Sequence, residues 1–167
     1  MIEVRTDDLA FVEADAIARP VDAELRATTP VLRRLEIAGG EGLARHLRVN
    51  EPLAVGSAVV TPAGALGVEL LIHAVVSSDT EQVSRTTVRQ AVSSALQRAS
   101  DWGIEHVALP PFGIGVGNLD VEDSADVMID AIRRHRQSAR HPARITIVVE
   151  TAFERDVFER LVSGVVA

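Results

Sequence analysis

The sequence of 167 residues contains no cysteine, no lysine and no tyrosine, and each absence excludes a kind of chemistry. Without cysteine there is no disulfide framework, no thiolate zinc site and no cysteine nucleophile. Without lysine there is no Schiff-base lysine and no P-loop lysine, and all 17 basic residues are arginine. Without tyrosine, any acid or base of an enzymatic mechanism would have to be another side chain.

Long apolar runs are also missing, although hydrophobic residues make up 47% of the chain. No run approaches the ~20 residues that a membrane-spanning helix needs. The first residues, Met1 to Asp8, are acidic, whereas a signal peptide would be basic and then apolar. We therefore expect a single cytoplasmic domain over residues 1–167, without a membrane segment. The net charge of −7 argues against binding to nucleic acid, because a basic surface supplies most of that affinity.

Short apolar segments alternate with amphipathic ones through most of the chain. The nearly unbroken apolar run 70–76 is typical of a strand buried on both faces of a sheet. Val88, Val92 and Leu96 recur at helical spacing and predict one buried stripe of a long helix. The alternation predicts a largely parallel sheet with helices on both faces. The expected strands are 2–5, 15–18, 57–61, 70–76, 107–109 and 144–149, and the expected helices are 22–37, 84–102, 121–136 and 153–162.

Prolines and glycines set the expected boundaries in the first third of the chain. Pro20 should stop the strand that begins at Asp15, because proline disfavours helix before it and lacks an N–H. The helix that follows should be interrupted near Thr28, or restart at Pro30. Gly39-Gly40 should end it, with one or two further helical turns after the glycines.

The stretch from Leu109 to Leu119 carries glycines at alternate positions, Gly113, Gly115 and Gly117, between an expected strand and an acidic-starting helix. Glycines let backbone N–H groups converge on an anion, which is a common use of a glycine-rich turn between a strand and a helix. The same spacing is expected of a tight connection that only needs positive φ angles. Taken alone, the loop leaves both interpretations open.

With this order of parts, the chain resembles the macro domain, a module that binds ADP-ribose, over nearly its full length. The most specific match is Ala108-Leu109-Pro110 with Gly113-Ile114-Gly115-Val116-Gly117, which corresponds to the segment that wraps the diphosphate and the distal ribose in that family. Asp15-Ala16-Ile17 corresponds to the family's second strand, and the segment 71–74 to its fourth. The resemblance implies a three-layer αβα sandwich with a mostly parallel, mixed central sheet.

Two stretches depart from the family's pattern. After the second strand, macro domains usually have Asn-Ala-Ala-Asn, whose asparagines orient the distal ribose and, in hydrolytic members, help to position the attacking water. This chain has Arg19-Pro20-Val21-Asp22 there. The family's first glycine-rich loop should lie between Asp22 and Val31, a segment that here contains no glycine. Side chains and a proline without an N–H are poor replacements for a backbone that wraps a diphosphate, so one wall of the expected cleft is rewritten.

The resemblance also implies ligand-binding roles for two side chains outside the loop. Asp8 corresponds to an early aspartate that receives the adenine amino group, and a carboxylate can accept such hydrogen bonds. Its alternative role is a turn residue that caps its own backbone. Phe153 lies where the family supplies a ring that stacks on adenine. Its alternative role is a core or staple residue of the last helix. The predicted ligand-binding residues are Asp8, Gly113, Ile114, Gly115, Val116, Gly117 and Phe153.

One residue is a candidate for catalysis, and no group is a candidate for metal binding. Asp22 stands in place of the family's second asparagine and could serve as a general base. The preferred interpretation is that it is the N-cap of the following helix. His73 has no partner at metal-ligand or catalytic spacing, so we expect it to be a hydrogen-bonded histidine of a buried strand. No metal and no cofactor is predicted.

Three functions compete. The favoured one is a binding module for ADP-ribose or a related nucleotide, free or on a mono-ADP-ribosylated protein, without catalysis. The alternative is a divergent structural or interaction domain in which Arg19, Arg26, Arg33 and Arg34 cover or fill the cleft; Arg19 or Arg26 could instead clamp a phosphate. The third is an ADP-ribosyl hydrolase or ADP-ribose-1″-phosphate phosphatase based on Asp22, against which the missing asparagines argue. The sequence leaves the oligomeric state open.

Overall fold

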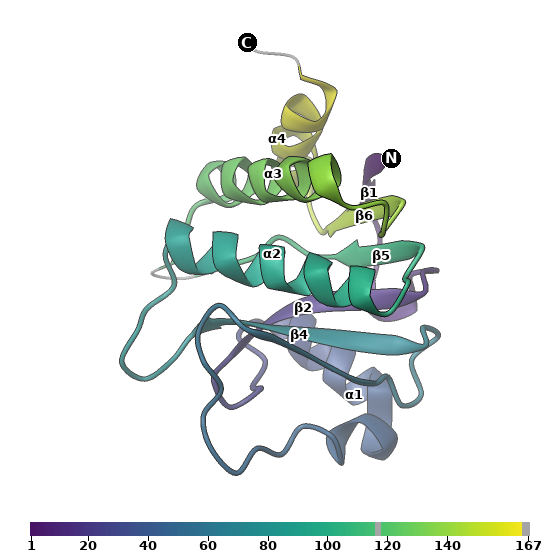
Figure 1. The fold of residues 1–167 in the computed structure, drawn as a ribbon, viewed down its shortest axis with the longest axis vertical. Helices are drawn as coiled ribbons and strands as arrows, with labels where there is room; N and C mark the ends of the chain where they lie inside the picture. Colours follow the sequence, from purple (N-terminus) through teal and green to yellow (C-terminus); the bar gives the residue numbers. More distant parts are fainter. Residues whose placement is uncertain (116–117, 165–167) are drawn as a thin grey trace.

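The computed structural model describes residues 1–115 and 118–164 and shows a sheet between two layers of helices (Figure 1). The strands are β1 (Ile2–Thr6), β2 (Ala16–Asp22), β3 (Ala58–Pro62), β4 (Leu70–Ser77), β5 (His106–Leu109) and β6 (Arg144–Val149). The helices are α1 (Pro30–Ala44), α2 (Arg85–Asp101), α3 (Val121–Ser138), α4 (Ala152–Ser163) and a short 3-10 helix, η1 (Leu9–Phe11).

The six strands lie in the order β1-β6-β5-β2-β4-β3. All neighbours are parallel except β3, which runs antiparallel to β4 at one edge of the sheet. Figure 1 shows α2 and α3 in front of the sheet and α1 behind it. The three-layer αβα sandwich with a mostly parallel, mixed sheet is therefore confirmed.

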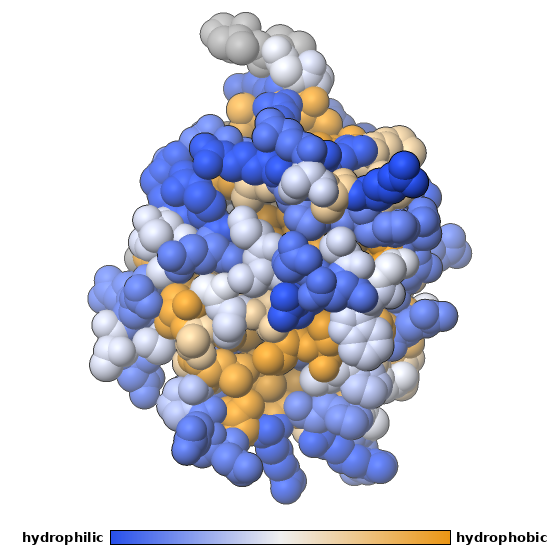
Figure 2. Space-filling model, viewed as in Figure 1, coloured by the Kyte–Doolittle hydropathy of each residue, from blue (hydrophilic) through white to orange (hydrophobic). Residues whose placement is uncertain are grey.

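Apolar side chains on both faces of the sheet hold the layers together. In β4, Ile72, Ala74 and Val76 pack in the cluster that includes the buried stripe of α2, whereas Leu71 packs with residues of α1 and η1. This burial on both faces is why the β4 sequence shows no alternation of apolar and polar residues. Figure 2 shows charged side chains over the outer surfaces of α2 and α3, with apolar surface gathered below α2 on the side of the sheet's β3 edge.

The predicted end of the second strand and the predicted start of the following helix are wrong. β2 continues through Pro20 to Asp22. Beyond Ile17, β4 is its one partner among the strands of the described residues, apart from an isolated bridge between Val21 and Ala27, so the missing N–H of Pro20 falls where the strand has a single neighbouring strand, as in an edge strand. The helix begins at Pro30, the restart point that the sequence indicated, and Gly40 interrupts it with a φ of 65°. No helix of the described residues is both long enough and apolar enough to cross a membrane.

Candidate functional site

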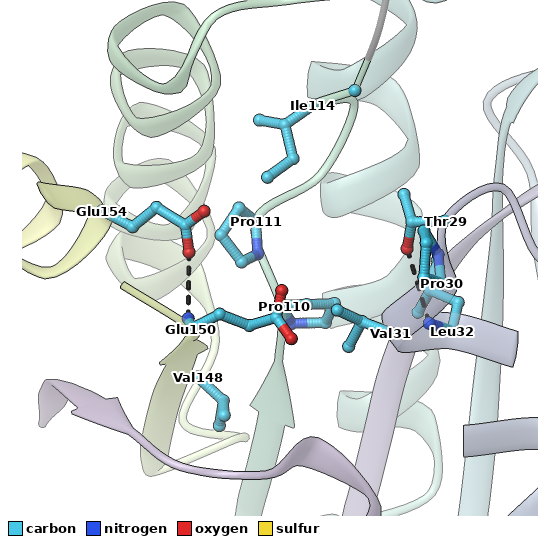
Figure 3. Close-up of a pocket in the computed structure, with 11 residues that line it drawn as sticks. Thr29, Pro30, Val31, Leu32, Pro110, Pro111, Ile114, Val148, Glu150 and Glu154 are labelled. Atoms are coloured by element: carbon cyan, nitrogen blue, oxygen red, sulfur yellow. Dashed lines mark hydrogen bonds between the residues drawn. The ribbon is translucent and has the colours of Figure 1, made fainter. Parts of the chain in front are cut away.

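The carboxyl ends of five neighbouring strands meet at one edge of the sheet, because β1, β6, β5, β2 and β4 are parallel. Ligands of open α/β sheets bind at this edge. The structure has a pocket there of about 220 Å³, between the start of α1 and the segments that follow β5 and β6 (Figure 3). The described residues that line it are Thr29, Pro30, Val31, Leu32, Pro110, Pro111, Ile114, Gly115, Val148, Glu150 and Glu154.

The glycine loop contributes one wall of the pocket through Ile114 and Gly115. Its base is anchored at Phe112, which is completely buried. The Phe112 N–H lies 3.1 Å from Met128 Sδ, and the Phe112 carbonyl accepts a hydrogen bond from Ser124 Oγ at 2.6 Å. Helix α3 thus fixes the point at which the loop leaves the core.

Positive φ angles are needed at both described glycines of this loop. Gly113 has a φ of 77°, and a Cβ there would lie 2.6 Å from Val88 Cγ2, so backbone conformation and packing both require glycine. Gly115 has a φ of 138°, and the Leu119 N–H closes the loop on the Gly113 carbonyl at 2.9 Å. The tight connection is therefore confirmed, whereas the anion-cradling role stays a prediction. Val116 and Gly117, which complete the predicted cradle, lie outside the described residues.

The opposite wall is the N-terminus of α1, which has few hydrogen-bond donors to offer. Pro30 is the first helical residue and carries no N–H. The Leu32 N–H points at Thr29 Oγ1, the N-cap, at 3.4 Å. A helix N-terminus normally presents such N–H groups to an anion, so this one offers an anion fewer donors than a helix without proline at its first position.

Asp22 closes a turn and does not cap a helix, so the preferred interpretation of its role is wrong. Its Oδ1 accepts from the backbone N–H groups of Glu24 and Arg26, both at 2.9 Å, and its Oδ2 accepts from Arg26 Nε at 2.8 Å. Thr29, not Asp22, caps α1. Both Asp22 oxygens are occupied, and the residue does not line the pocket. A catalytic role for Asp22 stays an untested prediction.

Arg19 lies in the core, where it makes a hydrogen-bonded network with β4 and α1. Its side chain is completely buried. Nε donates to His73 Nδ1 at 2.9 Å, one Nη to Glu36 at 2.6 Å and the other to the Leu25 carbonyl at 3.1 Å. Because His73 Nδ1 accepts, its Nε2 carries the proton and donates to Thr61 Oγ1 at 2.8 Å. The expectation that His73 is a hydrogen-bonded strand histidine is confirmed.

The electrostatics of this network keep His73 neutral. Burial, and after it the adjacent Arg19 charge, lower the pKa of His73 from 6.5 to about 3. Burial also lowers the pKa of Arg19, which the hydrogen bond and charge of Glu36 oppose. Arg19 is therefore neither a plug in the described pocket nor a phosphate clamp. The guanidinium completes the core at the position where macro domains carry an asparagine.

Two carboxylates that the sequence had not indicated as site residues line the pocket. Glu150 follows β6 directly, and Glu154 lies in the first turn of α4. One Glu154 oxygen accepts from the Glu150 N–H at 2.9 Å (Figure 3). Glu150 also pairs with Arg34 of α1 at 2.7 Å. The sequence did hold a signal for these two carboxylates, because they lie on either side of Phe153, a predicted ligand-binding residue. No group of three or more acidic or histidine side chains in the described ranges is arranged to hold a metal ion.

Asp8 and Phe153 lie near the same edge of the sheet but do not line the pocket. Asp8 is the N-cap of η1, where its Oδ1 accepts from the Ala10 N–H at 3.0 Å, the alternative role that the sequence left open. Phe153 is 57% exposed at the start of α4, so its ring is not a core residue. A free aromatic face is what stacking on a base requires. Both ligand-binding roles stay predictions.

Comparison with known proteins decides the family. A family model described as Macro domain matches residues 19–128. The chain belongs to the macro domain family. This macro domain is 33% identical over 135 residues to an uncharacterized protein of Mycobacterium tuberculosis, and the match covers 81% of this chain and 38% of that one. An uncharacterized protein of Aquifex aeolicus is 33% identical over 134 residues, covering 80% of this chain and 81% of that one. This macro domain therefore spans less than half the length of its mycobacterial relative.

Solved structures of macro domains share the fold at low sequence identity. A mutant of the Oceanobacillus iheyensis macrodomain with ADPR superposes with a TM-score of 0.85 at 16% identity, covering 98% of this chain and 92% of that one. The Trypanosoma brucei macrodomain in complex with ADP-ribose gives a TM-score of 0.85 at 15% identity, covering 96% and 68% of the two chains. The fold is thus that of a family that binds ADP-ribose, in a sequence that has diverged from these members.

Proposed function

We propose that this macro domain binds ADP-ribose or a related nucleotide in the pocket at the carboxyl ends of β2, β5 and β6, and that it does so without catalysis. The ligand is free, or it is the modification on a mono-ADP-ribosylated protein. The observation that carries the proposal is the pocket itself, which lies between the start of α1 and the Gly113–Gly115 segment. Relatives of the same fold hold ADPR or ADP-ribose in their solved structures.

The lining and volume of the pocket suit one part of a nucleotide. Val31, Ile114 and Val148 supply apolar surface, which suits the faces of a base or a ribose. The volume of about 220 Å³ lies below the ~300–1,000 Å³ of sites that enclose a drug-sized ligand. We therefore expect the pocket to hold part of the nucleotide, with the remainder along the rim near Phe153.

The hydrogen bonds of Asp22, the candidate catalytic residue, favour ligand binding over catalysis. A general base needs an oxygen free to take a proton from the attacking water. Both oxygens of Asp22 are held by Glu24 and Arg26. The rewritten α1 wall, with Pro30 and the capped Leu32, instead favours the second candidate, a divergent domain that has lost its ligand.

Calorimetry with ADP-ribose separates these two functions. Gly115→Glu places a side chain at the pocket wall, where, among the described residues, its Cβ would meet Asn118 Nδ2 at 3.5 Å. The variant should fold and lose measurable binding. Gly103→Glu is the matched control, since Gly103 also has a positive φ, of 64°, and an added Cβ there would have no atom of the described residues within 4 Å. Absence of heat with the unmodified protein at millimolar ADP-ribose would reject the proposal in favour of the divergent domain.

A further inference from the structure

The sheet ends in β3, which has β4 on one side and no strand of the described residues on the other. The Val75 N–H donates to the Ser57 carbonyl at 2.9 Å, which fixes the alternation of bonds along this antiparallel pair. The backbone groups of Val59 therefore face β4, and those of Ala58 and Val60 face outward. No backbone group elsewhere in the described ranges bonds to Ala58 or Val60.

The usual protections of an edge strand are weak at β3. Natural edges are often blocked by charged side chains, by proline or by a covering segment. No residue between Glu51 and Glu69 is charged, in a chain with a net charge of −7. Pro62 lies at an outward position but only at the end of the strand, beyond the half-buried Ala58 and Val60. Apolar surface gathers on this side of α2 (Figure 2), so the edge has what strand addition requires.

The outward groups of β3 are complementary to those of a second copy of the same strand. In an antiparallel pairing centred on Val59, Ala58 of each copy lies opposite Val60 of the other. Each such pair exchanges both of its hydrogen bonds, so every outward N–H and carbonyl of these residues is used. A pairing centred on Val60 would instead place the Ala58 carbonyl opposite Pro62, which has no N–H to give.

A groove beside the strand has room for the side chain that this pairing brings in. Ala58 and Val60 both pack in the cluster that includes the buried stripe of α2, so they lie on the face of the sheet that α2 covers. The groove has a volume of about 340 Å³ and is lined by Ser57, Ala58, Ser93, Ser94, Gln97 and Arg98. Because residues opposite each other share a face, Val60 of the second copy enters this groove beside the small Ala58.

We propose that two copies of this macro domain associate through β3, about a two-fold axis at Val59, so that their sheets become one continuous sheet. Such an interface uses the same surface of both copies, so it closes as a dimer and leaves neither β3 edge free. β3 contributes no residue to the pocket between α1 and the glycine loop. The dimer therefore stands or falls independently of ADP-ribose binding.

Disulfide trapping tests the register, because the chain has no cysteine of its own. Across the axis the two Val59 residues form a non-hydrogen-bonded pair with Cα atoms about 4.5 Å apart, within the range that a disulfide spans. Val59→Cys oxidised with oxidised glutathione should form a covalent dimer at least ~tenfold faster than the matched control Ala58→Cys, whose counterparts lie diagonally, about 7–8 Å apart. Equal rates, or no covalent dimer of Val59→Cys, would overturn the proposal.

Sedimentation equilibrium tests the dimer without a covalent bond. Ala58→Lys fills the groove and places a charge on the edge, so it should weaken dimerisation at least ~tenfold. Val60→Pro, which removes an outward N–H, should act in the same direction. Ala139→Lys makes the same substitution at a half-buried alanine with extended backbone after α3 and should leave the dimer intact.

Circular dichroism shows whether each variant is folded, so that loss of the dimer is not confused with loss of the fold. A concentration-dependent dimer that Ala58→Lys and Val60→Pro weaken while folded would support the proposal. A protein that stays monomeric up to ~1 mM, or a dimer that both folded variants leave unchanged, would overturn it.

Discussion

Replacing Glu36 by alanine should destabilise this macro domain by about 3 kcal/mol, because it leaves a buried cation without its partner. Arg19 is 0% exposed and Glu36 is 27% exposed, with Arg19 Nη1 and Glu36 Oε1 2.6 Å apart. Removing one partner of a buried ion pair costs ~3–5 kcal/mol. Water can reach the space left by Glu36, so we expect the lower end of that range.

Urea denaturation followed by circular dichroism measures this free energy of unfolding directly. Glu41→Ala is the matched control, since it makes the same change on the same helix at an exposed site. It should change stability by less than ~0.5 kcal/mol. A cost below ~1 kcal/mol for Glu36→Ala, or an equal cost for the two variants, would refute the view that Glu36 neutralises Arg19.

A second substitution separates the buried charge from the lost contacts. Arg19→Met in the Glu36→Ala background removes the uncompensated cation and should recover part of the lost stability, because apolar replacement of a buried ion pair is often neutral. The recovery stays partial, since the Leu25 carbonyl and His73 Nδ1 lose their donor. A double variant less stable than Glu36→Ala alone would contradict this account.

Two further predictions concern His73 and Phe153. The folded pKa of His73, about 3, lies below its ordinary 6.5, so stability should be full above pH 6.5 and fall by up to ~1.4 kcal/mol per pH unit as the pH drops toward 3. Urea titrations from pH 8 to 5 should show this slope, and a His73→Gln variant with the same slope would contradict it. Phe153→Ala should leave the urea midpoint unchanged, because the ring is 57% exposed, and should weaken ADP-ribose binding at least ~fivefold, because the base loses the ring on which we expect it to stack. Trp102→Ala, an exposed aromatic at the end of α2, should change neither.

Sequence pattern predicted most of the elements, because their signals are local. The run 70–76 and the stripe Val88, Val92 and Leu96 became β4 and α2 nearly as expected. The errors lie where tertiary pairing overrides local propensity. Pro20 continues a strand because β2 has only β4 beside it at that point, and the pairing of distant strands cannot be read from the residues around a proline.

In the candidate site, too, local features could be predicted from the sequence and contacts between distant segments could not. The glycine loop was visible in the chain, since positive φ angles at Gly113 and Gly115 are a backbone demand that only glycine meets easily. The carboxylates that line the pocket were passed over, because Glu150 and Glu154 are ordinary surface residues until β6 and α4 place them opposite α1. One alternative placed Arg19 in the cleft, whereas the structure buries its side chain in the core.

The sequence by itself determined the family, the alternation of strands and helices, and the loop at the end of β5, since each depends on residues close together in the chain. Only the tertiary structure decided the character of the cleft that this loop faces. A buried guanidinium is stable only where His73, Glu36 and Leu25 converge from separate segments, and a pocket acquires its charge from the strands that end beside it. The character of that cleft thus depends on contacts between residues more than a hundred positions apart, such as Arg34 with Glu150.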